Sequence, residues 1–333
     1  MTTSRSPFVL LITTLFFGLL LRFFIVSRAD FPLTDGGMFY TMISELQSNG
    51  FKMPVFTSYN LAEIPYAYPP LPFYFTGALC SLTGVDLFTL LRLLPALFSS
   101  LSVPAFFLFS RRILVKETHA FVAALIFAIQ PASFEWQIMG GGITRAPAYL
   151  FSILALYQAQ QMFTMPAWQH RLWTGVFLGL TALCHLEIAF VSIIFILLMA
   201  LFFGRNRNGM VGLVVSALVM IAVTAPYWLR VLLTHGINPF VYAFTSGEFA
   251  LVSSLIKLVL VHMTVFRSAL VILILLGWFG QVIRRDYFLP LLLIVCILFD
   301  PRSPARSGIL PGAMLACIAV LDIILPAIQS LTR

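Results

Sequence analysis

The stretch LTDGGMFYTMISELQSNGF (residues 33–51) interrupts a chain that is otherwise nearly all apolar. An apolar run long enough to cross a bilayer precedes it, and YPPLPFYF (68–75) follows shortly after. The stretch begins with one acid, Asp35, and two glycines, and its apolar residues then recur every three or four positions. That spacing is typical of a short amphipathic helix. We therefore expect the chain to leave the membrane after its first span and to form a short helix there.

Composition indicates an integral membrane protein throughout. The chain has 333 residues, of which 60% are hydrophobic and only 10% charged, and its mean hydropathy is +1.00. No long stretch is polar enough for a soluble domain, so residues 1–333 are expected to form one membrane domain. The predicted fold class is all-α, a polytopic membrane protein with about 10 transmembrane helices (range 9–12).

Ten segments are long and apolar enough to be predicted as spans. They are residues 7–26, 86–110, 119–134, 146–163, 171–187, 188–203, 210–229, 268–283, 287–300 and 308–328. The N-terminal segment has no cleavage site of the signal-peptide type, so it is interpreted as a retained first helix.

Pairs of arginines set the expected orientation. Arg111 with Arg112, Arg205 with Arg207, and Arg284 with Arg285 all occupy short connectors. The positive-inside rule places these connectors in the cytoplasm together with the N-terminus.

This orientation leaves two long outer loops, residues 27–85 and 230–267. Two further apolar stretches, 69–84 and 249–266, cannot cross the membrane in this orientation, because a crossing would move arginine pairs to the outer side. We expect the first to be an interfacial helix, so that the first outer loop holds two such helices, and the second to be an amphipathic segment.

The distribution of charge and of cysteines argues against a nucleic-acid-binding protein and against a cysteine-based site. The net charge of +8 comes from scattered or paired basic residues, which favours membrane orientation over nucleic-acid binding. The cysteines lie in apolar segments without CxxC spacing, which predicts small packing residues and not metal ligands or disulfides. They are Cys80, Cys184, Cys296 and Cys317.

Several outer residues have two explanations. Aspartate is among the best N-cap residues, so capping is the simplest role for Asp35, with Thr34 as another candidate, and capping also explains Asp86 before the second span. Gly36 and Gly37 weaken this explanation for Asp35, because glycines are poor helix formers and allow a ligand close to the backbone. The aromatic residues of 66–75 are expected to form a belt at headgroup level.

The order of these features resembles the GT-C glycosyltransferases. The likeness rests on the first span, the outer acid that opens a short helix, and YPPLPFYF followed by LTGVDLFTLLRLLPALFSSL. It extends through GLTALCHLEIAF, about the first 190 residues, and DPRSPARSGILP fits a late outer loop. Protein mannosyltransferases and lipid A aminoarabinose transferases are members of this superfamily. The resemblance implies two membrane-parallel helices in the first outer loop, as the arginine pairs also require.

The resemblance implies a function for Asp35. It matches the family's catalytic acid, which accepts the proton of the acceptor hydroxyl while the sugar leaves a polyprenyl-phosphate carrier. This sequence departs from the pattern twice, with Gly36 where many members have a second acid and Arg145 in GGGITRAP where many have an acid. Glu135, ten residues earlier, is the candidate to compensate.

A departing lipid phosphate needs positive charge or hydrogen-bond donors. The candidates at outer ends of spans are Arg145, His185, Glu187, Arg302 and Arg306, of which His185 and Glu187 share one turn. For each of these the alternative is structural, as a polar contact within the bundle or with lipid headgroups. No cofactor is certain, a divalent metal is allowed by the resemblance, and the metal ligands are unknown.

The sequence thus predicts a multi-pass membrane glycosyltransferase with its active face outside the cytoplasm. Its expected partners are a polyprenyl-phosphate sugar donor, membrane lipids and a glycan, lipid or protein acceptor that the sequence does not identify. The alternatives are a non-catalytic GT-C-like membrane subunit and a transporter or flippase for a lipid-linked sugar. Matched halves and broken helices, which would favour a transporter, are not evident in the sequence.

Overall fold

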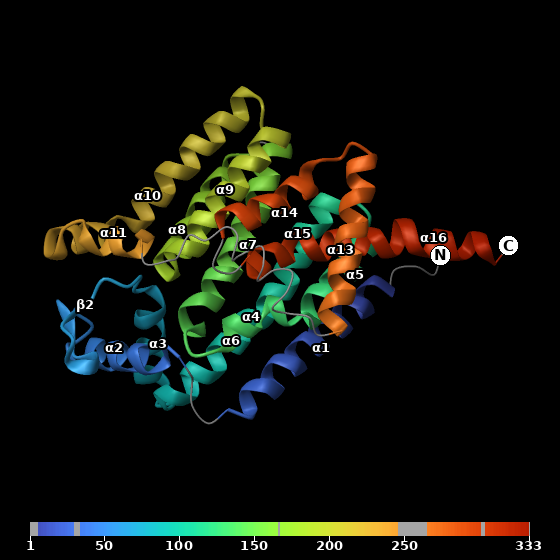
Figure 1. The fold of residues 1–333 in the computed structure, drawn as a ribbon. Helices are drawn as coiled ribbons and strands as arrows, with labels where there is room; N and C mark the ends of the chain where they lie inside the picture. Colours follow the sequence, from blue (N-terminus) through green and yellow to red (C-terminus); the bar gives the residue numbers. More distant parts are fainter. Residues whose placement is uncertain (1–5, 30–33, 166, 246–264, 301–303, 333) are drawn as a thin grey trace.

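The computed structural model describes residues 6–29, 34–165, 167–245, 265–300 and 304–332, and Figure 1 shows a bundle of helices. A helix coincides with each of the ten predicted spans. These helices are α1 (Ser6–Ser27), α4 (Leu87–Leu114), α5 (Glu117–Ile129), α7 (Gly142–Thr164), α8 (Trp168–Cys184), α9 (Leu186–Phe203), α10 (Arg207–His235), α13 (Val265–Ile283), α14 (Phe288–Phe299) and α15 (Pro304–Ile318). Helix α15 continues through the π-helix η3 (Ala319–Ile324) into α16 (Leu325–Leu331).

Smaller elements connect these helices. They are α2 (Gly36–Ser48), β1 (Phe56–Thr57), η1 (Tyr59–Leu61), β2 (Ile64–Pro65), α3 (Leu71–Thr83), η2 (Pro131–Ser133), α6 (Glu135–Ile138) and α11 (Asn238–Thr245). Strands β1 and β2 pair antiparallel, with Phe56 opposite Pro65 and Thr57 opposite Ile64. The predicted all-α class is confirmed, since this two-residue ladder is a local feature of one loop.

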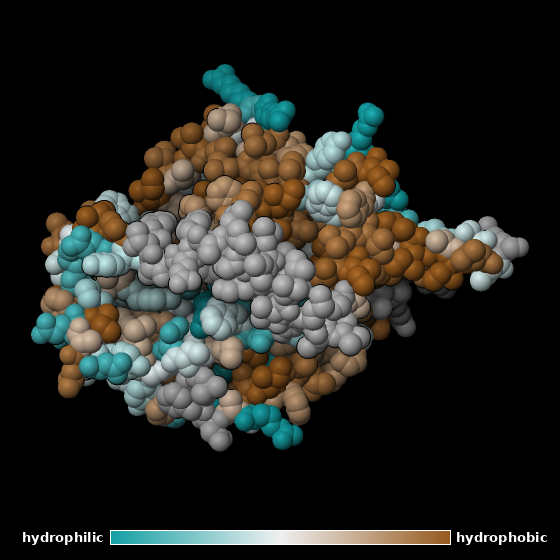
Figure 2. All heavy atoms as spheres, in the orientation of Figure 1, coloured by the Kyte–Doolittle hydropathy of each residue, from teal (hydrophilic) through white to brown (hydrophobic). Residues whose placement is uncertain are grey.

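Length and composition support a membrane protein. Among the described helices, α4, α9, α10 and the continuous run Pro304–Leu331 are long and apolar enough to cross a bilayer. Figure 2 shows brown, apolar side chains over the middle of the bundle, whereas hydrophilic side chains gather above the α9–α10 and α13–α14 turns and beside α2 and β2. The protein is therefore an integral membrane protein. The four cysteines are unpaired thiols, three of them buried, as their apolar surroundings predict.

Residues 34–85, most of the loop that the sequence predicts on the outer face, form a small layer of their own. Its helices α2 and α3 pack together at one end of the bundle (Figure 1), and Phe39, Met42, Ile43 and Leu46 of α2 are buried there. The predicted α2 is confirmed, and Gly50 with φ +61° follows its end.

The aromatic belt predicted for residues 66–75 is wrong for its inner members. Tyr66 and Phe73 are buried, and the Tyr66 hydroxyl donates a hydrogen bond of 2.8 Å to the Met42 carbonyl. These rings pack against α2 because the apolar faces within this loop are buried against each other and not against lipid. Phe75, which is 46% exposed, remains free to contact lipid.

A buried arginine fastens α1 to the bundle. Arg22 has no exposed surface, and its guanidinium donates to Ser99 Oγ (2.9 Å), Ser133 Oγ (3.1 Å) and the carbonyls of Gly18 (3.0 Å) and Ala128 (2.8 Å). Among the described residues it has no carboxylate partner within 4.0 Å. Hydrogen bonds from α4, α5 and η2 thus replace water around a charge inside the protein.

The second outer loop is described in part. Helix α10 continues to His235, beyond its predicted end, and α11 follows. The predicted amphipathic segment 249–266 lies outside the described residues except at its end, where α13 begins at Val265.

Candidate functional site

Asp35 occupies the residue before α2, but its side chain does not cap that helix. Its backbone is α-helical (φ −69°, ψ −3°), and its carboxylate makes no capping hydrogen bond. An N-cap residue normally has an extended backbone, which lets the side chain fold back onto the first-turn N–H groups. The expected capping role is therefore wrong. The carboxylate is 57% exposed and faces Arg145 instead.

Arg145 lies in the first turn of α7, where α7 meets the outer loop. Its side chain is only 5% exposed, and its Nη2 is 3.7 Å from Asp35 Oδ2. The guanidinium carbon lies 4.4 Å from the centre of the Trp136 ring, so the charge rests on an aromatic face. Nη2 has no hydrogen-bond partner among the described residues, which leaves a buried donor available to a ligand.

The glycines of GGGITRAP make room for this arginine. A Cβ added to Gly141 would overlap the Arg145 guanidinium, and one added to Gly142 would overlap the Gln137 carbonyl. These glycines therefore do more than form a plain loop. Gly141 accommodates the side chain that would contact the ligand.

Arg306, at the start of α15, is the centre of a second group of charges. Its Nη2 lies 3.3 Å from Glu187 Oε1 and 3.2 Å from Asp300 Oδ1, and all three come from different helix ends. The Tyr149 hydroxyl donates to the Arg306 carbonyl (3.0 Å). Asp300 is 1% exposed, so this pair is fixed within the protein, whereas Glu187 is partly exposed and extends the group toward the outside.

Tyr68 lies between the two groups. Its hydroxyl is 3.4 Å from Thr144 Oγ1, and its ring meets the His185 ring edge to face, with 6.4 Å between the centres. Burial raises the pKa of Tyr68 to about 12, so its phenol remains a protonated hydrogen-bond donor at neutral pH. Because Tyr68 contacts both Thr144, next to Arg145, and His185, close in sequence to Glu187, it connects the two groups.

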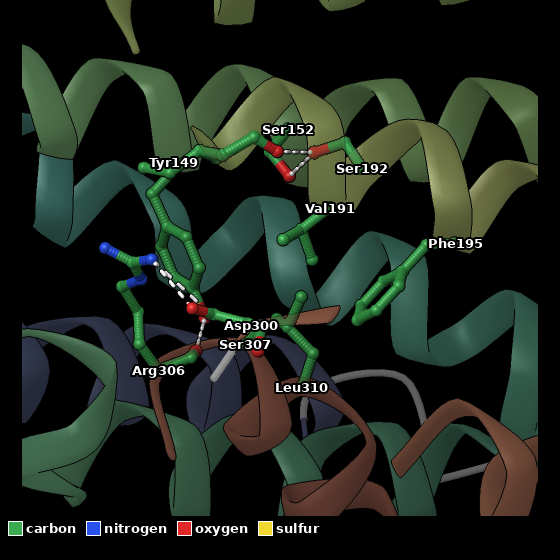
Figure 3. A pocket seen from close by; sticks show the side chains of 10 residues that line it. Tyr149, Ser152, Val191, Ser192, Phe195, Asp300, Arg306, Ser307 and Leu310 are labelled. Carbon is green, nitrogen blue, oxygen red and sulfur yellow. Dashed lines mark hydrogen bonds and ion pairs between the residues drawn. The ribbon is translucent and has the colours of Figure 1, made fainter. Parts of the chain in front are cut away.

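A small cavity lies beside Arg306, on the inner side of this site. Figure 3 shows Tyr149, Asp300 and Arg306 on one side of it, and Val191, Phe195 and Leu310 on the apolar side. The hydroxyls of Ser152 and Ser192 are 2.7 Å apart at its edge. The cavity thus joins a charged end, toward the outside, to an apolar interior.

Comparison with known proteins finds two similarities. Residues 67–229 match the family model described as dolichyl-phosphate-mannose-protein mannosyltransferase. The fold is similar to the crystal structure of ArnT from Cupriavidus metallidurans in the apo state, with a TM-score of 0.60 and 16% sequence identity. The similarity includes 99% of this chain and 62% of that one. Part of the chain is thus similar to a mannosyltransferase family, and its fold is similar to that of ArnT.

The two matches cover different parts of the candidate site. The family match contains Arg145, His185 and Glu187, but it begins after Asp35 and ends before Arg306. The chain spans 62% of the length of the ArnT chain. No curated protein matches the sequence.

The structure brings most of the predicted site residues together. Asp35, Arg145, His185, Glu187 and Arg306 lie in one region of the protein, although 271 residues separate the first from the last. Arg302 lies outside the described residues. Glu135 is exposed at the start of α6, and the neighbouring Trp136 is the residue whose ring contacts Arg145.

Sequence reasoning missed three members of the site. Tyr68 was assigned to an aromatic belt at headgroup level, although its place directly before the proline pair at the start of α3 could have indicated a role there. Asp300 was noted only as part of a charged loop. Trp136 carried no signal, because its partner Arg145 is brought to it by the α6–α7 turn.

The described residues do not offer a metal site. They contain no group of three or more histidine, cysteine, aspartate or glutamate side chains placed to hold a metal ion. Asp35, Glu187 and Asp300 each face an arginine, which supplies the positive charge that a metal would otherwise provide.

Proposed function

We propose that this protein is a membrane glycosyltransferase of the GT-C superfamily, which transfers a sugar from a polyprenyl-phosphate donor to an acceptor hydroxyl on the outer membrane face. The observation that supports this proposal most directly is the orientation of Asp35. A helix-start carboxylate that makes no cap and is more than half exposed beside a buried arginine is placed for chemistry, not for helix stability.

Asp35 is the proposed general base. The acceptor oxygen attacks the anomeric carbon, the bond between that carbon and the phosphate oxygen breaks, and the acceptor proton passes to the Asp35 carboxylate. A hydroxyl is a weak nucleophile, and a positioned base typically accelerates such a step by roughly a hundred- to ten-thousand-fold. Exposure of the carboxylate permits an acceptor from the aqueous side to reach it.

Arg145 and Arg306 are the proposed phosphate ligands, with Arg302 as a further candidate. Negative charge grows on the phosphate as the glycosidic bond breaks, and buried cations stabilise that charge better than exposed ones. Arg145 Nη2 provides a donor that no described residue uses. Tyr68 and His185, which lie between the two arginines, are placed to orient the phosphate or the sugar.

Two groups of observations favour this function over the alternatives. A flippase would need polar residues along a path through the bilayer, whereas the proposed residues gather at one end of the bundle. A non-catalytic subunit would have no reason to keep an uncapped, exposed carboxylate within 3.7 Å of a buried arginine.

The test is incubation of the purified protein with a panel of polyprenyl-phosphate sugars, with release of the lipid phosphate as the measured quantity. Turnover of one donor, dependent on an added acceptor, is the expected result. Binding of a donor without turnover in the presence of glycan, lipid and peptide acceptors would instead identify a non-catalytic subunit.

A further inference from the structure

A second cavity lies at the other end of the bundle. Asp322 borders it, sixteen residues after Arg306 on the same helical run, or about 24 Å away at 1.5 Å per residue. The cavity has a volume of about 330 Å³ and is lined from the α4–α5 turn, the end of α9, the α13–α14 turn and η3. These connectors hold the arginine pairs, so the cavity lies where span helices end and lipid headgroups begin.

One carboxylate at this cavity is fully compensated. Asp322 is 3.0 Å from His119 Nε2, 3.5 Å from Arg284 Nη1 and 3.6 Å from Lys116 Nζ. The distance to Lys116 is longer than a hydrogen bond, and the Lys116 side chain is 66% exposed. The Lys116 ammonium therefore keeps its N–H donors for a ligand.

The other carboxylate at this cavity is not compensated. Asp286 accepts one hydrogen bond, of 3.0 Å, from Gln281 Nε2. Among the described residues, no cation lies within 4.0 Å of it. The cavity therefore presents an available cation, Lys116, and an available anion, Asp286.

Apolar side chains form the remaining wall. Phe202, Phe203, Phe288, Leu289 and Ile318 line the cavity beside the charged residues. Phe203 and Phe288 meet edge to face, with 4.9 Å between their centres, and Phe202 is 39% exposed toward the outside of the bundle. A ligand here would meet charges at one end and hydrocarbon at the other.

The backbone around the cavity is irregular. The described residues include seven non-glycine positions with positive φ, and five of them lie in the first outer loop. The other two are Val115 (φ +63°), which lines the cavity, and Arg285 (φ +61°), next to Asp286. A β-branched residue in this region is strained, and a π-helical stretch such as η3 is frequent at functional sites.

We propose that this cavity binds a phospholipid headgroup that contains both a phosphate and a primary ammonium. Lys116 would bind the phosphate, Asp286 would accept hydrogen bonds from the ammonium, and the phenylalanines would pack against the glycerol and first methylenes. A headgroup that is only anionic would be repelled by Asp286 and would leave that carboxylate without a partner. One with a quaternary ammonium could not donate hydrogen bonds to Asp286.

Native mass spectrometry of the delipidated full chain tests this proposal. The probes are phosphatidylethanolamine, phosphatidylglycerol and phosphatidylcholine with identical acyl chains, added at equal concentration. We expect phosphatidylethanolamine to be retained about tenfold more than either of the others. Lys116→Gln and Asp286→Asn should each lower its retention by about three- to fivefold, as expected for loss of one partly exposed ion pair.

Glu117→Gln is the matched control. Glu117 follows Lys116 directly, but it pairs with Arg111 at 3.7 Å and does not line the cavity, so retention should stay unchanged. Equal retention of phosphatidylglycerol or phosphatidylcholine by the parent protein would overturn the proposal, and so would a Glu117→Gln effect as large as that of Asp286→Asn. If a variant does not fold, the selectivity of the parent protein among the three lipids still decides.

Discussion

Asp35 and Asp86 stand at the two ends of the first outer loop, each directly before a helix, and their local sequences predict the same role. Asp86 has an extended backbone (ψ 138°), and its carboxylate accepts a 3.0 Å hydrogen bond from the Thr89 N–H at the start of α4. Asp35 has a helical backbone, makes no such bond and faces Arg145. The residue type is therefore the same, and one backbone angle separates a structural carboxylate from a candidate catalytic one.

Helix α2 therefore lacks the stabilisation that a side-chain cap would give it. A missing cap costs a helix about 1 kcal/mol, and α2 also begins with Gly36 and Gly37, which are poor helix formers. Burial of Phe39, Met42, Ile43 and Leu46 against the rest of the loop stabilises α2 despite this start. Tertiary packing thus frees the Asp35 carboxylate from its ordinary local role.

The largest expected effect separates these two acids by activity. Asp35→Asn should lower turnover of an accepted donor by roughly a hundred- to ten-thousand-fold, since an amide cannot accept the acceptor's proton. Asp86→Asn should leave turnover essentially unchanged, because Asn caps a helix as well as Asp. Rates would be measured in detergent on variants with matching thermal melts. Similar rates for the two variants would show that Asp35 is not the general base.

The next effect concerns the partner of Asp35. Arg145→Lys should lower kcat/KM for the donor by about ten- to a hundredfold, because an ammonium cannot bind two phosphate oxygens as a guanidinium does. Arg112→Lys, an exposed change at the other end of the bundle, is the control and should have no effect. Normal donor use by the Arg145→Lys protein would show that phosphate binding depends on other residues.

A smaller effect follows from the glycine beneath that arginine. Gly141→Ala places a methyl group where the Arg145 guanidinium lies, and the displaced charge should lower kcat/KM for the donor by roughly tenfold. Gly308→Ala is the matched control near Arg306, since its added carbon would meet only ordinary contacts of 3.5 and 3.8 Å. An unaffected Gly141→Ala protein would mean that the position of Arg145 is unimportant for donor use.

The smallest effect tests capping itself through the free energy of unfolding. Asp86→Ala should be less stable than Asp86→Asn by about 1 kcal/mol, because only Asn retains the cap. At residue 35 the Ala and Asn variants should differ by a few tenths of a kcal/mol at most, since no cap is present to lose. Denaturant titration in detergent measures both differences. A gap as large at residue 35 as at residue 86 would restore the capping role of Asp35.

Much of the fold could be predicted because lipid imposes a simple rule. A spanning helix must be apolar over a fixed length, so each of the ten predicted segments coincides with a helix. Helix α2 was predictable from the spacing of Met38, Met42 and Leu46. Arginine pairs predicted that residues 69–84 form a helix beside α2 in an outer loop; α3 does pack on α2, whereas the membrane face stays a prediction.

The sequence predicted which residues belong to the site better than it predicted which of them contact one another. Charged residues near the ends of apolar segments are few, so Asp35, Arg145, Glu187 and Arg306 could be selected by type and place. Their pairing could not, because Asp35 and Arg145 are 110 residues apart and a local signal favoured capping. The backbone angle that decides between the two roles of Asp35 depends on how the whole loop packs.

Arg22 has a consequence for how the protein is made. A charged residue inside α1 is costly in hydrocarbon, and its described hydrogen-bond acceptors outside α1 lie 77 to 111 residues later in the chain. At roughly 5–20 residues per second of synthesis, α1 emerges from the ribosome about 5–20 seconds before Ser99, Ala128 and Ser133 can all receive it. We therefore expect the first helix to stay at the insertion machinery, released into lipid only when α4 and α5 arrive to enclose its charge.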